Sequence, residues 1–184
     1  MKRALFLVLL VACGSPVRET TTVAHTAPDD RRIVERFEIR GVLDGRAAEL
    51  RALVHDHIAP GIELTEQRYD AAHQAIENDY YERGHANVRL DWPDFNKIKG
   101  PFALVLTIRE GPRFKIKSLD VAGVADADRQ RYLAFAMIKP GDYWARSKLR
   151  AWYQAIADTG AEVEPETTVD LVAETIAITV HLKK

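Results

Sequence analysis

Few residues in this chain have the types and spacing that catalysis or metal binding would need. The sequence has a single cysteine, Cys13, and contains neither a Gly-x-Ser-x-Gly motif nor a glycine-rich phosphate loop. His55 and His57 flank Asp56 and could in principle share a metal ion. On a helix, however, residues two apart point about 200° apart, which makes a shared ion geometrically poor. We therefore expect these histidines to be solvated surface residues.

A second acidic group lies near the carboxyl end of the chain. Glu162, Glu164 and Glu166 alternate with other residues, so on a strand they share one face. Such a row could coordinate a cation, but a solvent-facing edge strand produces the same pattern. We favour the edge strand and expect no catalytic residue, no metal, no cofactor and no small-molecule substrate.

The lone cysteine, Cys13, directly follows an apolar segment at the start of the chain. Lys2 and Arg3 precede an apolar run of nine residues, 4–12, which has the form of a secretory signal. The run is too short to span a bilayer, which takes about 20 residues. Leu10-Val11-Ala12 before Cys13 resembles the bacterial lipobox, which implies cleavage after residue 12 and acylation of Cys13. The alternative is an ordinary cleavage site that leaves a free thiol.

Composition predicts folded protein behind this segment. Residues 13–31 are rich in Ser, Thr and Pro, and we expect them to be the lipidated cysteine and a flexible tether. The rest is long enough for two domains of about 75 residues, which we place at 32–111 and 112–184. The formal net charge of −1 provides no basic field, so we expect no nucleic-acid partner.

An internal repeat supports this division. Ile58, Pro60-Gly61 and Gln74-Ala75-Ile76 recur 80 residues later as Ile138, Pro140-Gly141 and Gln154-Ala155-Ile156. Further upstream, Phe37, Ile39 and Gly41-Val42 correspond to Leu119, Val121 and Gly123-Val124 at an offset of 82. Repeated spacing of this kind indicates two copies of one structural unit.

The first copy predicts a strand followed by two helices. Residues 37–41 alternate between apolar and charged and end at a glycine, which is typical of a half-buried strand. Residues 50–58 have apolar side chains at helical spacing, and Pro60-Gly61 should end that helix. A second helix begins near Thr65 and ends at Gly84. Its apolar stripe contains Tyr69, Ala72, Ile76 and Tyr80, and the second copy has Leu149, Trp152 and Ile156 at matching positions.

Two strands complete each copy. Residues 88–92 alternate in polarity, whereas residues 102–108 are almost continuously apolar. Residues 163–171 and 176–182 show the same order in the second copy. The fold class is therefore α+β, with two tandem βααββ domains. Each should have a three-stranded mixed sheet, with the more apolar last strand in the centre and both helices on one face.

A βααββ unit with these turn motifs resembles the POTRA (polypeptide-transport-associated) domain. The motifs are Ile39-x-Gly41, Pro60-Gly61, Tyr81-x-x-Gly84 and Glu110-Gly111-Pro112. The chain departs from the family at His85, where an aromatic residue usually follows the glycine. The second copy lacks Glu-Gly-Pro, and its second helix should be about one turn shorter. We interpret Gly84 and Gly111 as residues that adopt positive φ rather than as binding residues.

The resemblance implies a function in the envelope of a bacterium. In that family, POTRA domains precede an outer-membrane barrel and hold client polypeptides partly by adding a strand to a sheet edge. The sequence ends at Lys184, with no room for a barrel, so we expect no pore. We expect an accessory lipoprotein on the periplasmic face of the outer membrane. Its partners would be client polypeptides or the POTRA domains of a separate barrel protein.

Three alternatives remain open: a hub for another envelope complex such as the division machinery, a truncated barrel protein, and, last, an enzyme. For binding, we expect a partner strand to pair with the first-domain edge made of Ala86, Asn87, Val88, Arg89, Leu90, Asp91 and Trp92. The equivalent edge near Val163 contains Pro165 and the three glutamates, which should disfavour strand addition. Among the tryptophans, Trp152 should lie in the core and Trp144 should be the most exposed.

Overall fold

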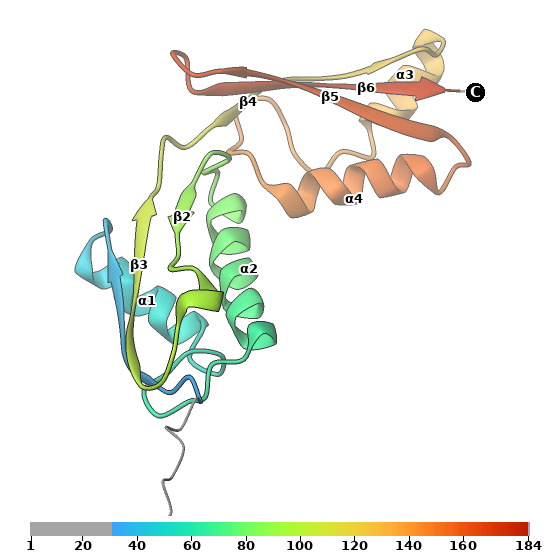
Figure 1. Ribbon diagram of the computed structural model, residues 1–184. Helices are drawn as coiled ribbons and strands as arrows, with labels where there is room; N and C mark the ends of the chain where they lie inside the picture. Colours follow the sequence, from blue (N-terminus) through green and yellow to red (C-terminus); the bar gives the residue numbers. More distant parts are fainter. Residues whose placement is uncertain (1–30, 184) are drawn as a thin grey trace, which may run out of the picture.

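A computed structural model of the chain describes residues 31–183, which form two units of similar build (Figure 1). The predicted signal segment, Cys13 and nearly all of the tether lie outside the described residues. The first unit consists of β1 (Val34–Arg40), α1 (Asp44–Leu53), α2 (Glu66–Glu82), β2 (Arg89–Asp91), the short 3-10 helix η1 (Phe95–Lys97) and β3 (Phe102–Arg109). The second consists of β4 (Lys115–Ala122), α3 (Asp126–Leu133), α4 (Arg146–Ala157), β5 (Glu162–Asp170) and β6 (Thr175–Lys183).

Each unit has a three-stranded sheet with its last strand in the middle. The strand orders are β1-β3-β2 and β4-β6-β5. β3 runs parallel to β1 and antiparallel to β2, and β6 has the same relation to β4 and β5. Leu104, Leu106 and Ile108 of β3 are at most 1% exposed, because alternate side chains of a central strand face the core. The predicted βααββ fold with a mixed sheet is confirmed.

Both helices of each unit lie on one face of its sheet (Figure 1). α2 begins after Thr65, whose hydroxyl accepts a hydrogen bond from the backbone N–H of Arg68 at 3.3 Å. The apolar stripes bury the predicted side chains, which are Ala72, Ile76 and Tyr80 on α2 and Leu149, Trp152 and Ile156 on α4. α4 has 12 residues against 17 in α2, so the predicted shortening is confirmed. Among residues 31–183, no helix combines the length and apolarity needed to cross a membrane.

The buried apolar residues form two separate core clusters, one in each unit. Ile76 and Ile156, which the sequence repeat relates to each other, are both fully buried, one in each cluster. Ala86, from the turn after α2, packs against the second cluster although it belongs to the first unit. The two cores are therefore distinct but in contact at this turn.

The first helix is shorter than the apolar pattern predicts. α1 ends at Leu53, well before Pro60, and the Leu53 side chain is 47% exposed. Val54 and Ile58 are buried all the same. Both lie in one turn that follows the helix, in which the Val54 carbonyl accepts hydrogen bonds from the N–H groups of His57 and Ile58. The helical spacing in the sequence thus reflected a helix followed by a single turn rather than one continuous helix.

The predicted edge strand 86–92 is also shorter than expected, because β2 contains only Arg89–Asp91. The N–H groups of Ala86 and Val88 donate to the carbonyls of Gly84 and His85, so this part of the chain forms turns. At the other end, Pro93 has no N–H to continue a ladder. Local turns therefore use the backbone groups that a longer strand would need.

Candidate protein-interaction surface

β2 forms one edge of the first sheet, opposite β1, and lies in the segment for which the sequence predicts partner binding. Arg89 and Asp91 are exposed, and Asp91 accepts a hydrogen bond from Arg109 of β3 at 2.9 Å. Val88, Leu90 and Trp92 point the other way and pack against the first core. The structure thus brings the centre of the predicted segment to a sheet edge.

Trp92 anchors the end of this edge against the core. Its ring stacks on Phe37 with centroids 6.2 Å apart and meets Tyr69 edge to face at 5.3 Å. The Tyr69 hydroxyl donates to the Pro93 carbonyl at 2.7 Å. These contacts pack the chain against the core at the point where β2 ends.

β5 forms the corresponding edge of the second sheet and is nine residues long. Glu164 lies 2.7 Å from the Lys183 ammonium and Glu166 lies 2.9 Å from the His181 ring. The Lys183 hydrogen bond holds the pKa of Glu164 below its usual value. These cross-strand pairs place the glutamate row on one face of β5, as predicted, and the residues between them face the helices.

A groove of about 480 Å³ runs between α4 and β5. Its lining residues are Ala86, Trp144, Arg146, Leu149, Arg150, Tyr153, Pro165, Thr167, Val169 and Ile176. Burial raises the pKa of Tyr153. Within residues 31–183, Arg150 forms no ion pair, so its guanidinium is available to a carboxylate. Trp144, predicted to be exposed, is half-buried between this groove and the first unit.

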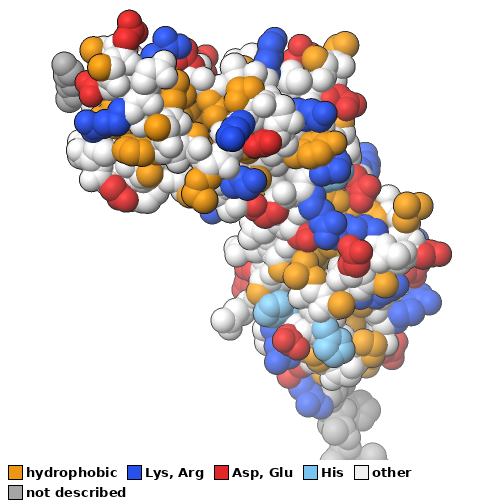
Figure 2. Space-filling model, turned by 180° about the vertical axis from the view of Figure 1, so that it is seen from behind, with side chains coloured by type: hydrophobic (Ala, Val, Ile, Leu, Met, Phe, Trp, Pro, Cys, Tyr) orange, Lys and Arg blue, Asp and Glu red, His pale blue; other side chains and the backbone are white. Residues whose placement is uncertain are grey.

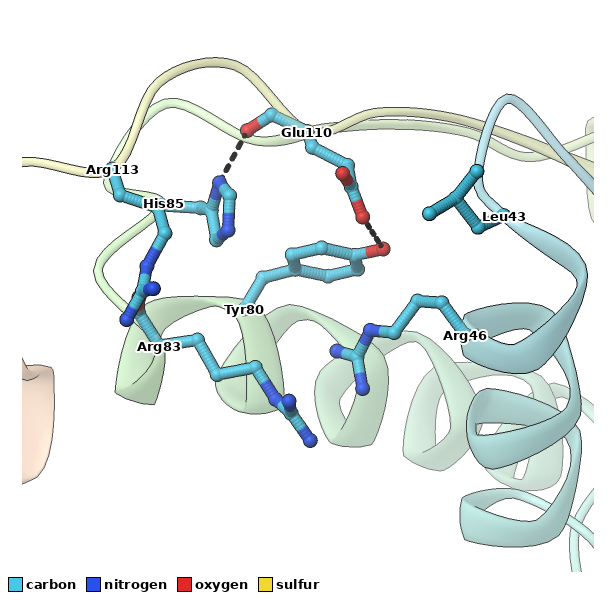
Figure 3. Close-up of a pocket in the computed structure, with 7 residues that line it drawn as sticks. All are labelled: Leu43, Arg46, Tyr80, Arg83, His85, Glu110 and Arg113. Atoms are coloured by element: carbon cyan, nitrogen blue, oxygen red, sulfur yellow. Dashed lines mark hydrogen bonds between the residues drawn. The ribbon is translucent and has the colours of Figure 1, made fainter.

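A second cavity, of about 280 Å³, lies where α1, α2 and the segment after β3 meet (Figure 3). The Tyr80 hydroxyl donates a hydrogen bond to the Glu110 carboxylate at 2.8 Å. The Arg46 guanidinium lies 4.8 Å from the Tyr80 ring centroid. Arg46 also pairs with Asp79 and, at 2.9 Å, with Glu49. Burial and the Glu110 hydrogen bond raise the pKa of Tyr80, so its hydroxyl stays protonated. These groups satisfy one another and form a structural network.

The two glycines of the family motif have the predicted role. Gly84 and Gly111 have φ of 97° and 67°, where side chains are strained. A Cβ at Gly111 would lie 2.3 Å from Oδ1 of Asn87. Next to them, Nδ1 of His85 lies 3.2 Å from the Glu110 carbonyl oxygen (Figure 3). The motif residues therefore lock the turn after α2 to the segment that leaves β3.

Sequence reasoning missed the residues that join the two units. Tyr81 meets Trp144 edge to face, with centroids 5.5 Å apart, and Glu77 of α2 lies 3.6 Å from Arg146 of α4. Glu82 accepts hydrogen bonds from Ser147. The sequence held one indication of this contact. Ala145, the residue before α4, has no side chain that could cap the helix, so a cap would have to come from another part of the chain. We call these contacts, between residues 77–82 and 144–147, the joint.

The remaining predicted candidates form no site. His55 and His57 follow the end of α1, and residues 31–183 contain no group of three or more His, Cys, Asp or Glu able to hold a metal. Acidic and basic side chains are interspersed over both units on the face shown in Figure 2. The surface features that bear on the predicted binding are thus the β2 edge, the β5 edge and the α4–β5 groove.

Comparison with known proteins gives matches of two kinds. Residues 33–111 match the POTRA family model, described as a surface antigen variable number repeat. A search of curated proteins found no match. Among solved structures, POTRA domains 3–5 of BamA from Haemophilus influenzae align with a TM-score of 0.66 and 19% identity. BamA from Haemophilus ducreyi lacking POTRA domains 1–3 aligns with a TM-score of 0.66 and 15% identity.

These alignments cover 83% of this chain in both cases. They cover 61% of the Haemophilus influenzae structure and 29% of the Haemophilus ducreyi structure, so the chain spans less than two thirds of either. At these identities the likeness shows the fold. It extends through both units, whereas the family model matches the first.

Proposed function

Because the first unit of this chain is a POTRA domain and the second repeats its fold, we propose that the chain is a non-enzymatic envelope lipoprotein that presents both units to protein partners. The partners are client polypeptides or the POTRA domains of a separate outer-membrane barrel protein, during assembly or transport. The match of residues 33–111 carries the proposal. The paired polar groups around Tyr80 and the paired glutamates of β5 support a binding role over an enzymatic one.

We place the protein on the periplasmic face of the outer membrane, held by acyl chains on Cys13. Support comes from the signal-like segment and from the position of the lone cysteine directly behind it. Several acyl chains together suffice for stable attachment. The tether would then let both units reach partners near the membrane surface.

The first-domain edge is our proposed site for strand addition. An extended partner would pair with the outer side of β2, within residues 86–92, where Arg89 and Asp91 nearly cancel in charge. Pro165 remains the argument against strand addition at β5, because it removes one backbone donor. The glutamate argument is weaker than the sequence alone suggested, since Glu164 pairs with the Lys183 ammonium and Glu166 lies 2.9 Å from the His181 ring.

A second contact is favoured by the α4–β5 groove. Its apolar walls fit the side chains of an extended segment, and Arg150 fits a carboxylate of that segment. We therefore propose that the groove binds a peptide with apolar side chains and an acidic residue, through side-chain burial rather than strand addition.

Photo-crosslinking in intact cells tests this function. A photoreactive amino acid at Arg89, on β2, should give crosslinks to outer-membrane barrel components or to unfolded client chains, identified by mass spectrometry. The same amino acid at exposed Arg51, on α1, is the control and should give few. Crosslinks at Arg89 to division proteins alone would instead favour the hub alternative.

A further inference from the structure

The α4–β5 groove belongs to the second unit, yet the first unit supplies part of its wall. Ala86 lines the groove and also packs against the second core. Trp144, which forms an aromatic wall, has its ring held at 88° to that of Tyr81. An edge-to-face pair of this kind fixes the position of both rings. The shape of the groove thus depends on a residue that does not line it.

The start of α4 depends on the first unit in a similar way. The N-cap residue Ala145 has no side chain to satisfy the first N–H groups of the helix. Glu82, the last residue of α2, accepts hydrogen bonds from the Ser147 backbone N–H at 2.8 Å and from its hydroxyl at 2.6 Å. A carboxylate at a helix N-terminus is favourable because it meets the positive end of the helix dipole. Glu82 therefore caps the N-terminus of α4, although it belongs to the first unit.

Arg146, which lines the groove, is also held from the first unit. Its guanidinium lies 4.7 Å from the Tyr81 ring centroid and 3.6 Å from the Glu77 carboxylate. Backbone hydrogen bonds from Phe114 to Gly84 and from Trp144 to Phe114, both 2.9 Å long, link the same region. The first turn of α4 is therefore attached to the end of α2 by ring, charge and backbone contacts.

We propose that Tyr81 and Glu82 are positioning residues for the α4–β5 groove, so that the groove binds its peptide only while the joint is closed. This inference rests on the peptide binding proposed above for the groove. Its consequence is that a partner which opens or closes the joint controls the affinity of a site that it does not touch.

Peptide binding by variants of the full-length purified protein tests this inference. The probe is a fluorescein-labelled decapeptide of alternating Val and Thr with one Phe and one Asp, and its affinity is measured by fluorescence anisotropy. Tyr81→Ala should raise the Kd about three- to tenfold, which matches the loss of one aromatic pair. Glu82→Gln should also raise it, whereas Glu66→Gln, at the opposite end of α2, should leave it unchanged.

A mutant cycle separates positioning from general damage to the fold. If Tyr81 acts through Trp144 and Arg146, then Tyr81→Ala should have little further effect on the Kd in a background that carries both Trp144→Ala and Arg146→Ala. A full additive loss from Tyr81→Ala in that background would overturn the inference, as would wild-type binding by both Tyr81→Ala and Glu82→Gln. Tyr153→Ala and Arg150→Ala change the groove lining directly. If neither of them weakens binding, the proposed groove site itself is wrong.

Discussion

At the scale of single residues, Tyr80 links three segments of the first unit. Its ring is 1% exposed and lies under the Arg46 guanidinium, while its hydroxyl reaches Glu110 in the segment after β3. The His85 ring meets it edge to face at 5.4 Å. A hydrogen bond from a buried hydroxyl to a charged acceptor contributes more to the stability of the fold than one on the surface. The reason is that losing either partner leaves the other as a desolvated polar group without a hydrogen bond.

Tyr80→Phe should therefore lower the free energy of unfolding by about 1 kcal/mol at neutral pH, measured by chemical denaturation. The variant should also be less sensitive to alkaline pH. Burial raises the pKa of Tyr80 above its ordinary 10.0, so the folded state favours the protonated phenol. This stability is fully present below pH 10.0 and is lost as the pH rises above it, because only the unfolded tyrosine ionises there.

The test compares wild type and Tyr80→Phe from about pH 8 to about pH 11. Tyr69, Tyr81 and Tyr153 also have raised pKa values. The free energy of unfolding of Tyr80→Phe should therefore still fall with rising pH, but less steeply than that of the wild type. Parallel pH curves for the two proteins would show that Tyr80 does not contribute in this way.

At the scale of secondary-structure elements, the edge strands β2 and β5 differ in length and in what surrounds them. β2 has three residues and is held at its end by Trp92, whereas β5 has nine residues and borders a groove. Short edge strands limit unwanted pairing between sheets. A three-residue edge can still start a ladder if the partner strand continues beyond it.

Arg89→Pro tests strand addition at β2. Proline at this position removes a backbone donor and should weaken crosslinking or pull-down of the partner while leaving the circular dichroism spectrum close to that of the wild type. Val88→Pro is a less specific test, because it also removes the hydrogen bond from the Val88 N–H to the His85 carbonyl within the turn. If binding survives both proline variants but fails on changes near Val163, the partner pairs with β5 instead.

At the scale of the whole molecule, two separate cores are connected by a short segment and by the joint. β3 ends at Arg109 and β4 begins at Lys115. The joint consists of a few polar and aromatic contacts on the surface of each unit, whereas each core buries its own set of large side chains. The cores should therefore unfold separately, with the joint adding a modest coupling between them.

Ile76→Ala and Ile156→Ala test this independence. Each removes a fully buried side chain and should destabilise its own unit by about 2 to 5 kcal/mol. Calorimetry of the wild type should resolve two unfolding transitions, and each variant should shift one of them. A single transition that both variants shift together would show that the units unfold as one.

Cys13→Ala tests the proposed anchor. Without acyl chains the protein should be processed less well and should move to the soluble fraction after cell fractionation, because those chains are its proposed membrane attachment. Ser15→Ala, two residues away, is the matched control and should remain with the membrane. Membrane retention of Cys13→Ala would refute lipid anchoring at this residue.

The sequence alone determined the order of elements, the two copies and most of the core. These features are local, since the period of apolar side chains and the glycines at turns depend on neighbours along the chain. Ile76 and Ile156 were identified because the repeat places them on matching helix faces, and both proved fully buried. Gly84 and Gly111 were identified because positive φ strongly favours glycine.

Only the tertiary structure decided where elements end and how the two units meet. β2 is short because turn hydrogen bonds compete for its backbone, and α1 ends early although Val54 and Ile58 remain buried. The contact between Glu82 and Ser147 joins residues 65 positions apart. No periodic pattern records such a pair, because its energy depends on how two complete units pack against each other.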